Sequence, residues 1–205
     1  FVIGHFLLEP AGKLLGCDWR LDLWNAELRG VITTDVGHIR IRHYVHTDEM
    51  LLVTELESSA GEQAYRWMWH PGEAKTTRKG IPYTQQDIET FADSYGEHYR
   101  TMLRPYEPNP PARLEEEQGI NVCVQDLLVG GQYATAWREV HWEGGVRLFL
   151  VSIANTYPEC TARDEAVQTI RRAAEASEEE RTATHRRWWH AYYPASLVTL
   201  PDKGL

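Results

Sequence analysis

The sequence predicts a mainly β fold, an antiparallel β-sandwich followed by C-terminal linker helices. Short apolar segments with period-two alternation recur at spacings of about ten residues in the first part of the chain, which is typical of a sandwich. A hairpin signal, Glu143–Gly145, separates two further strand candidates. After Pro158 the apolar spacing changes to that of an amphipathic helix, so helices follow the strands.

Five segments before Pro71 have the composition of strands: Phe6–Leu8, Leu21–Leu28, His38–His46, Met50–Leu56 and Tyr65–Trp69. The clearest alternation is in His38–His46, where four residues are expected on the core face: Ile39, Ile41, His43 and Val45. Three more strands are expected later in the chain: Ile120–Val124, Tyr133–Trp142 and Val146–Ala154.

Residues 71–118 differ in composition and are interpreted as an insertion in the sandwich. They are rich in proline and glycine, and Glu115–Glu117 form an acidic run that is expected to be solvated. Within the insertion only Gln85–Tyr95 has helical spacing. We therefore expect a sandwich domain at residues 1–158, which contains the insertion, and a helical linker at residues 159–205.

Two helices are expected in the linker. The first has Thr161 as its N-cap, with Asp164 three residues on, and its apolar stripe is Ala166, Val167, Ile170 and Ala174. The second starts at Ser177, with Glu180 in the capping-box position. Proline cannot continue the hydrogen bonds of a helix, so the second helix is expected to end before Pro194.

The second helix carries a stretch rich in aromatic residues, from His185 to Asp202. Helical spacing puts four of them on one face, which we expect to pack against the sheet: His185, Trp188, Trp189 and Tyr192. A different, polar face holds Arg186, Arg187 and His190. An exposed polar face explains these three without a ligand. They and Asp202 are nevertheless the residues that we single out as candidates near a substrate.

Tyr65, Trp67 and Trp69 alternate along one predicted strand and share a face. Such a row of rings can stack on sugars, which makes it a candidate carbohydrate-binding platform. It can also be a core face of the sandwich. The core interpretation is favoured, because aromatic side chains dominate such cores.

Charge and residue spacing count against several classes of function. The net charge of −9 disfavours binding to nucleic acid or to an anionic membrane surface. No apolar run approaches the roughly 20 residues of a membrane helix. We expect neither a metal nor a cofactor, because no metal-ligand spacing or phosphate-binding loop occurs. The three widely spaced cysteines do not indicate a disulfide framework: Cys17, Cys123 and Cys160.

Three stretches resemble the N-terminal sandwich and linker of bacterial glycoside hydrolases related to family 95, the fucosidase-type group. Leu21–Leu28 and the strands up to Met50–Glu57 resemble the start of that sandwich. Ala134–Ala154 followed by Asp164–Ala176 is similar to its last strands and first linker helix, and His185–Asp202 is similar to the linker that enters the barrel. The resemblance implies a supersandwich-like arrangement and an α/α barrel after the linker. That barrel would hold the catalytic carboxylates, so no catalytic residue is expected in residues 1–205.

The resemblance also implies that the intact protein hydrolyses a glycosidic bond in a polysaccharide or oligosaccharide, in the periplasm or outside the cell. This chain would be its non-catalytic N-terminal domain, inactive alone, with the barrel and the carbohydrate as partners. Sugar phosphorylases and some polysaccharide lyases have a similar plan, so the reaction type stays open. Two other classes also stay open: a stand-alone carbohydrate-binding or adhesion sandwich, and a purely structural module.

Overall fold

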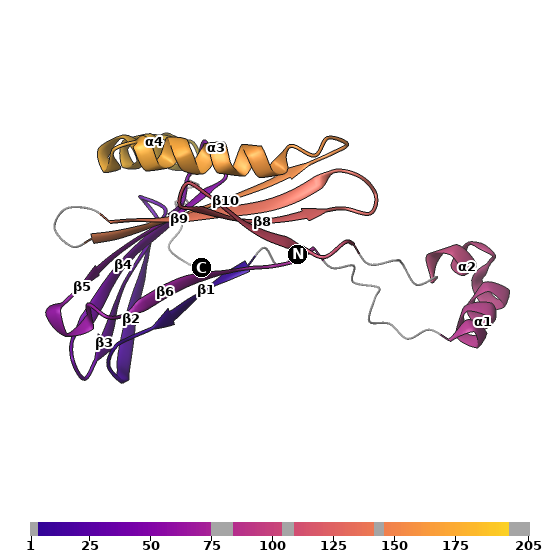
Figure 1. Ribbon diagram of the computed structural model, residues 1–205, viewed down its shortest axis with the longest axis horizontal. Helices are drawn as coiled ribbons and strands as arrows, with labels where there is room; N and C mark the ends of the chain where they lie inside the picture. The colour runs from indigo at the N-terminus through magenta and orange to yellow at the C-terminus, as the bar shows by residue number, and fades with distance from the viewer. Residues whose placement is uncertain (1–3, 75–83, 104–108, 142–145, 197–205) are drawn as a thin grey trace, which may run out of the picture.

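The computed structural model describes residues 4–74, 84–103, 109–141 and 146–196 (Figure 1). Eight strands form one antiparallel sheet in the order β2 (Leu14–Asp22), β3 (Glu27–Thr34), β4 (His38–Val45), β5 (Leu51–Ser58), β10 (Val146–Thr156), β9 (Gln132–His141), β8 (Ile120–Asp126) and β7 (Arg113–Glu117). A second antiparallel sheet pairs β1 (Gly4–Glu9) with β6 (Arg66–Pro71). The predicted fold class, a β-sandwich followed by helices, is confirmed.

The large sheet is covered on both faces and therefore has two cores. The helices α3 (Ala162–Glu175) and α4 (Glu178–Ser196) lie over one face, and β1 and β6 lie over the other (Figure 1). The core under the helices includes Leu51, Val53, Ile120, Val122, Val124, Ala134, Ala136, Leu148, Leu150 and the apolar stripe of α3. The core toward β1 and β6 is built from Ile32, Ile39, Ile41, Leu56, Tyr65 and Phe149, with Phe6, Leu8 and Trp67 packed against it.

Strand β4 shows how two covered faces modify the predicted alternation. Ile39 and Ile41 are buried on the β1–β6 side, as expected. On the opposite face Arg42 and Tyr44 are buried as well, because helices cover that face. Val45 was expected in the core and is instead 53% exposed, since it lies at the uncovered end of the strand.

The prediction of a strand over residues 21–28 is wrong, because this segment is a hairpin turn. Strand β2 ends at Asp22, and β3 begins at Glu27. The Asp22 carboxylate accepts hydrogen bonds from the backbone N–H of Asn25 (3.2 Å) and from its side-chain Nδ2 (2.8 Å). Ala26 then adopts a left-handed conformation with φ of 50°. The local hydrogen bonds between Asp22 and Asn25 therefore favour a turn here, in spite of the strand preference of the apolar residues around them.

Residues 71–118 contain more regular structure than the sequence predicts. The expected helix at Gln85–Tyr95 is confirmed as α1, and a short helix, α2 (His98–Met102), follows it. The expectation of a solvated acidic loop is wrong: Glu115–Glu117 lie in β7, which pairs with β8. Arg163 of α3 donates to Glu115 and Glu117 at 2.8 Å each, so these carboxylates tie the edge strand to the helix.

The two C-terminal helices begin with different caps. Ser177 and Glu180 form the predicted capping box of α4: each accepts the other's backbone N–H, at 3.2 and 2.9 Å. The predicted cap of α3 by the Thr161 side chain is absent. Its place is taken by the Thr156 hydroxyl, which accepts the backbone N–H groups of Thr161 (3.2 Å) and Ala162 (3.1 Å). A residue from the end of β10 therefore caps α3.

The predicted end of the second helix is also wrong, because α4 continues through Pro194 to Ser196. Pro194 lies in the last turn and is exposed. Proline has no N–H to donate to the carbonyl four residues earlier, so the helix loses one hydrogen bond close to its end.

Candidate functional site

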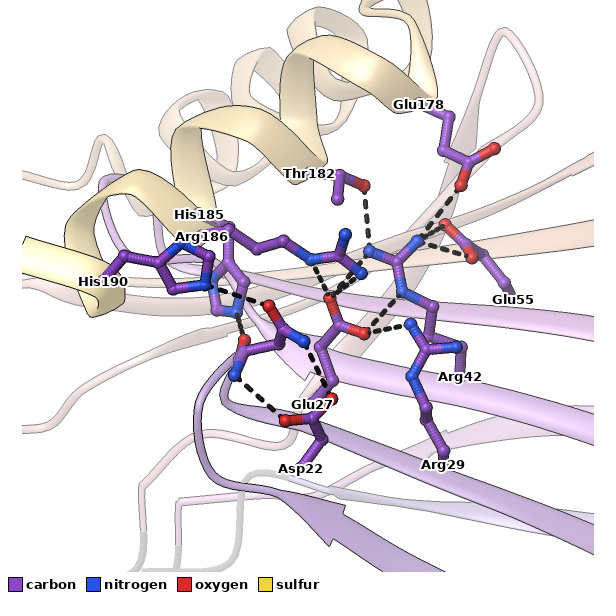
Figure 2. A network of polar contacts seen from close by, with 11 residues as sticks. Asp22, Glu27, Arg29, Arg42, Glu55, Glu178, Thr182, His185, Arg186 and His190 are labelled. Carbon is purple, nitrogen blue, oxygen red and sulfur yellow. Dashed lines mark hydrogen bonds and ion pairs between the residues drawn. The ribbon is translucent and has the colours of Figure 1, made fainter. Parts of the chain in front are cut away.

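The candidate site lies where α4 crosses β3 and β4, and it is centred on Glu27. Glu27 is the first residue of β3, and its side chain is fully buried. Figure 2 shows Arg29, Arg42 and Arg186 reaching this carboxylate from β3, β4 and α4. Arg42 donates to both carboxylate oxygens at 3.0 Å, Arg29 donates at 2.6 Å, and Arg186 donates at 2.7 Å. One buried carboxylate therefore joins the helix to the sheet.

Arg42 forms the second centre of this network. Its Nη1 donates to both oxygens of Glu55 on β5 (3.1 and 2.9 Å) and to Glu178 (3.2 Å). Its Nη2 also donates to the Thr182 hydroxyl at 2.9 Å. Glu178 and Thr182 are one helical turn apart at the start of α4. Arg42 thus holds the first turns of α4, while Glu27 holds its middle.

The protonation of these groups follows from burial and from their ion pairs. Burial raises the pKa of Glu27, but hydrogen bonds from Arg42 and Arg186 outweigh it and hold the pKa below its usual range. For Glu55 burial dominates, so its pKa is raised in spite of the bonds from Arg42. Burial lowers the pKa of Arg42, and the neighbouring Glu27 and Glu55 more than reverse that effect. Glu27 is therefore a charged anchor at neutral pH and not a proton donor.

The later turns of α4 rest on the turn between β2 and β3. His185 is fully buried, and its Nε2 donates to the carbonyl oxygen of Asn25 at 3.0 Å. His190 Nε2 lies 3.0 Å from the side-chain Oδ1 of the same asparagine. The Trp24 ring stacks on His190 at 4.5 Å between centroids. Asn25, which Asp22 holds in place, therefore accepts hydrogen bonds from two histidines of α4.

An open cavity of about 630 Å³ adjoins the network on the same face of the sheet. One wall is α4, which contributes Glu178, Thr182 and Arg186. The floor is formed by side chains of β2, β3, β4 and β5, and most of them are charged: Asp18, Arg20, Arg29, Arg40, Arg42, Glu55 and Glu57. The cavity can accept a polar ligand through arginine donors that the network leaves exposed.

The predicted orientation of α4 is partly wrong. His185 is buried as expected, but Trp188 and Tyr192 are 45% and 47% exposed and stack on each other. Arg186 and His190, expected to face away from the sheet, point toward it and bind Glu27 and Asn25. The physical reason is the buried carboxylate, because a charge without water needs donors from whichever element covers it.

The other sequence-predicted site residues are not part of the network. Arg187 is exposed on α4, and Asp202 lies outside the described residues. Tyr65 is 3% and Trp69 8% exposed, and Trp67 stacks on Phe6 at 4.9 Å between centroids. This position in the core toward β1 and β6 favours packing as the role of these rings. Sugar stacking by them stays a prediction.

Sequence reasoning missed Glu27, Arg42 and Asn25. Arg42 sits in the period-two pattern of β4 as an apparently exposed residue, and Glu27 sits in a segment that was assigned to one long strand. Asp22 and Asn25 carried a usable signal, because the side chains of aspartate and asparagine bond to nearby backbone groups and favour turns. The burial of Glu27 and Arg42 depends on α4, which is far away in the sequence.

The described ranges contain no candidate metal centre and no candidate membrane-spanning helix. No three His, Cys, Asp or Glu side chains there are grouped so that they could hold a metal ion. None of the helices in these ranges is long and apolar enough to cross a membrane.

Comparison with known proteins relates the chain by fold. No protein-family model matches it, and no curated protein matches its sequence. A solved structure described as a putative kojibiose phosphorylase from human microbiome matches with a TM-score of 0.54 at 10% sequence identity. The match covers 84% of this chain and 22% of that chain, so this chain spans less than a quarter of that protein. The fold described above therefore occurs within a carbohydrate-active enzyme.

Proposed function

We propose that this chain is a non-catalytic sandwich domain of a larger carbohydrate-active enzyme, and that α4 connects it to the catalytic domain. The observation that supports the proposal most is the extent of the fold match. Most of this chain, but only 22% of the putative kojibiose phosphorylase, is covered by the match. The family-95 resemblance in the sequence supports the same role. In this proposal the catalytic carboxylates lie in a barrel domain of the same protein.

The polar network supports a connecting role for α4. A helix that leads from one domain to another must leave the sandwich in a defined direction. Glu27 accepts from Arg186, and Asn25 accepts from His185 and His190, so these two residues together hold successive turns of the helix and set that direction. Arg186 and His190 act as positioning residues in this proposal, whereas Arg187 and Asp202 border the bound carbohydrate.

The test compares the full-length protein with residues 1–205. Both are incubated with a panel of disaccharides and oligosaccharides, with and without inorganic phosphate, and released sugars are measured. We expect turnover by the full-length protein and none by residues 1–205. Turnover without phosphate indicates hydrolysis, as in the family-95 resemblance, whereas dependence on phosphate indicates phosphorolysis.

A different outcome would support the stand-alone binding module. In that case the full-length protein turns over no glycan, while residues 1–205 bind one. Loss of this binding in Trp67→Ala would assign it to the predicted aromatic platform. Turnover by the full-length protein without glycan binding by residues 1–205 would exclude the platform and retain the proposed role.

A further inference from the structure

Three arginines form a row across the sheet beside α4. Arg20 on β2 is paired in register with Arg29 on β3, and Arg29 is paired with Arg42 on β4. Side chains directly opposite in an antiparallel sheet have Cβ atoms about 5 Å apart, and like charges in such positions destabilise the sheet. Residues that weaken the local structure in this way are often retained for binding.

The nearby carboxylates accept hydrogen bonds from only some of the guanidinium donors in this row. Arg42 is almost buried and bonds to Glu27, Glu55 and Glu178. Arg29 has one ion pair, to Glu27, and 47% of its side chain is exposed. Arg20 is exposed and makes no hydrogen bond within the part of the chain that the structure describes; it attracts the Asp22 carboxylate, two residues further along the same face of β2, only electrostatically. Unused guanidinium donors therefore increase from the centre of the row to its edge.

These donors converge on the cavity of about 630 Å³. Arg20 and Arg29 belong to its floor, and Arg186, whose side chain is 32% exposed, belongs to its wall. Three of the four carboxylates in the lining already bind arginines: Glu55 and Glu178 bind Arg42, and Glu57 binds Arg40. The fourth is Asp18, which is exposed and lies next to Arg20 along the same face of β2.

We propose that this cavity binds the oxyanion of an acidic sugar, with Arg20 and Arg29 as its donors. A guanidinium presents parallel N–H groups that match the two oxygens of a carboxylate or a phosphate. The volume lies within the range of about 300–1,000 Å³ that is usual for small-molecule sites. A sugar carboxylate and a sugar phosphate share this chemistry, and the test separates them.

The site is distinct from the domain-connecting role proposed for α4. Its ligand contacts come from two sheet residues that do not anchor the helix directly. The experiment measures binding by this chain, so it does not depend on whether a catalytic domain is present. Failure of the binding test therefore leaves the proposed function standing, and loss of the proposed function leaves the binding result unchanged.

The test is a calorimetric titration of the chain at constant ionic strength with glucuronate, glucose 6-phosphate, inorganic phosphate and glucose. We expect glucuronate or glucose 6-phosphate to bind and neutral glucose not to bind. Whichever of these two acidic sugars binds more tightly shows whether the site recognises a sugar carboxylate or a sugar phosphate. Binding of inorganic phosphate as tight as that of either sugar would show that the sugar is not recognised and would overturn the proposal.

Variants decide whether the arginine row is responsible. Arg20→Gln and Arg29→Gln should each weaken binding by about tenfold or more, since a hydrogen bond to a charged group is worth that much. Arg113→Gln is the matched control, because Arg113 is an exposed sheet arginine on β7 that pairs with Asp126 at 2.8 Å. Equal weakening by Arg113→Gln, or unchanged binding in Arg20→Gln, would overturn the proposal. Arg20 makes no hydrogen bond within the described residues and Arg20→Gln loses only the attraction to Asp22, so this variant is expected to fold normally.

Discussion

The helices α3 and α4 lie on the same face of one sheet, but different forces hold them there. Five apolar side chains of α3 are buried against the sheet: Ala162, Ala166, Val167, Ile170 and Ala173. The two residues of α4 that are buried in the described part of the chain are Arg181 and His185. Apolar burial is non-directional and changes little with pH, whereas charged hydrogen bonds fix geometry and depend on protonation.

The difference explains how consecutive helices can have different tasks. The stripe of α3 completes the hydrophobic core, so this helix is part of the sandwich. The orientation of α4 is set by a few partners in the sheet and in the β2–β3 turn, mainly Glu27, Arg42 and Asn25. A connecting helix needs a defined direction more than it needs a large buried area. Substitutions on the two helices should therefore have different consequences.

The largest effect is expected for Glu27→Gln. The substitution keeps the size of the side chain but removes the charge that faces three guanidinium groups. Breaking a buried ion pair by removing one partner costs about 4 kcal/mol, because the remaining charge stays uncompensated. We expect the free energy of unfolding, measured with urea, to fall by about that amount. Hydrogen exchange should become faster in α4 than in α3.

The matched control for this variant is Glu57→Gln. Glu57 pairs with Arg40 at 3.5 Å, and both side chains are more than half exposed. An exposed pair of this kind contributes less than about 1 kcal/mol. If the two variants lost the same stability, Glu27 would not be the anchor that the network suggests.

A smaller loss is expected for Ile170→Ala on α3. Ile170 is fully buried in the core between α3 and the sheet. Truncation of a buried isoleucine to alanine costs about 3 kcal/mol, through lost burial and the cavity that remains. Because this loss involves no charge, it should be the same at neutral and mildly acidic pH. Val129→Ala is the control, since Val129 is 78% exposed and its truncation should change the free energy of unfolding very little.

The same contrast accounts for what the sequence could predict. The fold class, α1 and the Ser177–Glu180 capping box depend on residues close together in the chain, and they were predicted correctly. Most of the stripe of α3 was also predicted, because an apolar period identifies a face without knowledge of its partner: Ala166, Val167 and Ile170 are buried, and Ala174 is partly buried against the same core.

The orientation of α4 could not be obtained in this way. Arg186 and its partner Glu27 are 159 residues apart, and His190 and Asn25 are 165 apart. Hydrophobicity alone favours Trp188 over Arg186 as the buried residue. Burial of Arg186 becomes favourable only because the buried Glu27 carboxylate faces it across the interface between α4 and the sheet. The position of Glu27 depends in turn on the strand register and on the β2–β3 turn.

The smallest of the three stability effects is expected from pH and concerns His185. Burial lowers the pKa of His185 below the usual 6.5, and the hydrogen bonds to the Asn25 and Ala26 carbonyls partly offset this effect. The unfolded chain therefore binds more protons at acidic pH than the folded chain does. The contribution of neutral His185 to the free energy of unfolding is therefore complete above about pH 6.5 and decreases as the pH falls below that value. The partial offset is why the effect should be smaller than that of Glu27→Gln.

His43 allows the effect to be assigned to α4. Burial lowers the pKa of His43 as well, but this residue lies on the opposite face of β4 and contacts Thr54 at 2.7 Å. Both histidines should therefore contribute to the loss of stability in acid. Of the two, only His185 contacts the β2–β3 turn, where it bonds to Asn25. Acid should speed hydrogen exchange in α4 more in the wild type and in His43→Gln than in His185→Gln, where only the global effect of His43 remains. Equal acceleration in all three proteins would mean that α4 is not held through His185, and Asn25 would then act on the helix through His190.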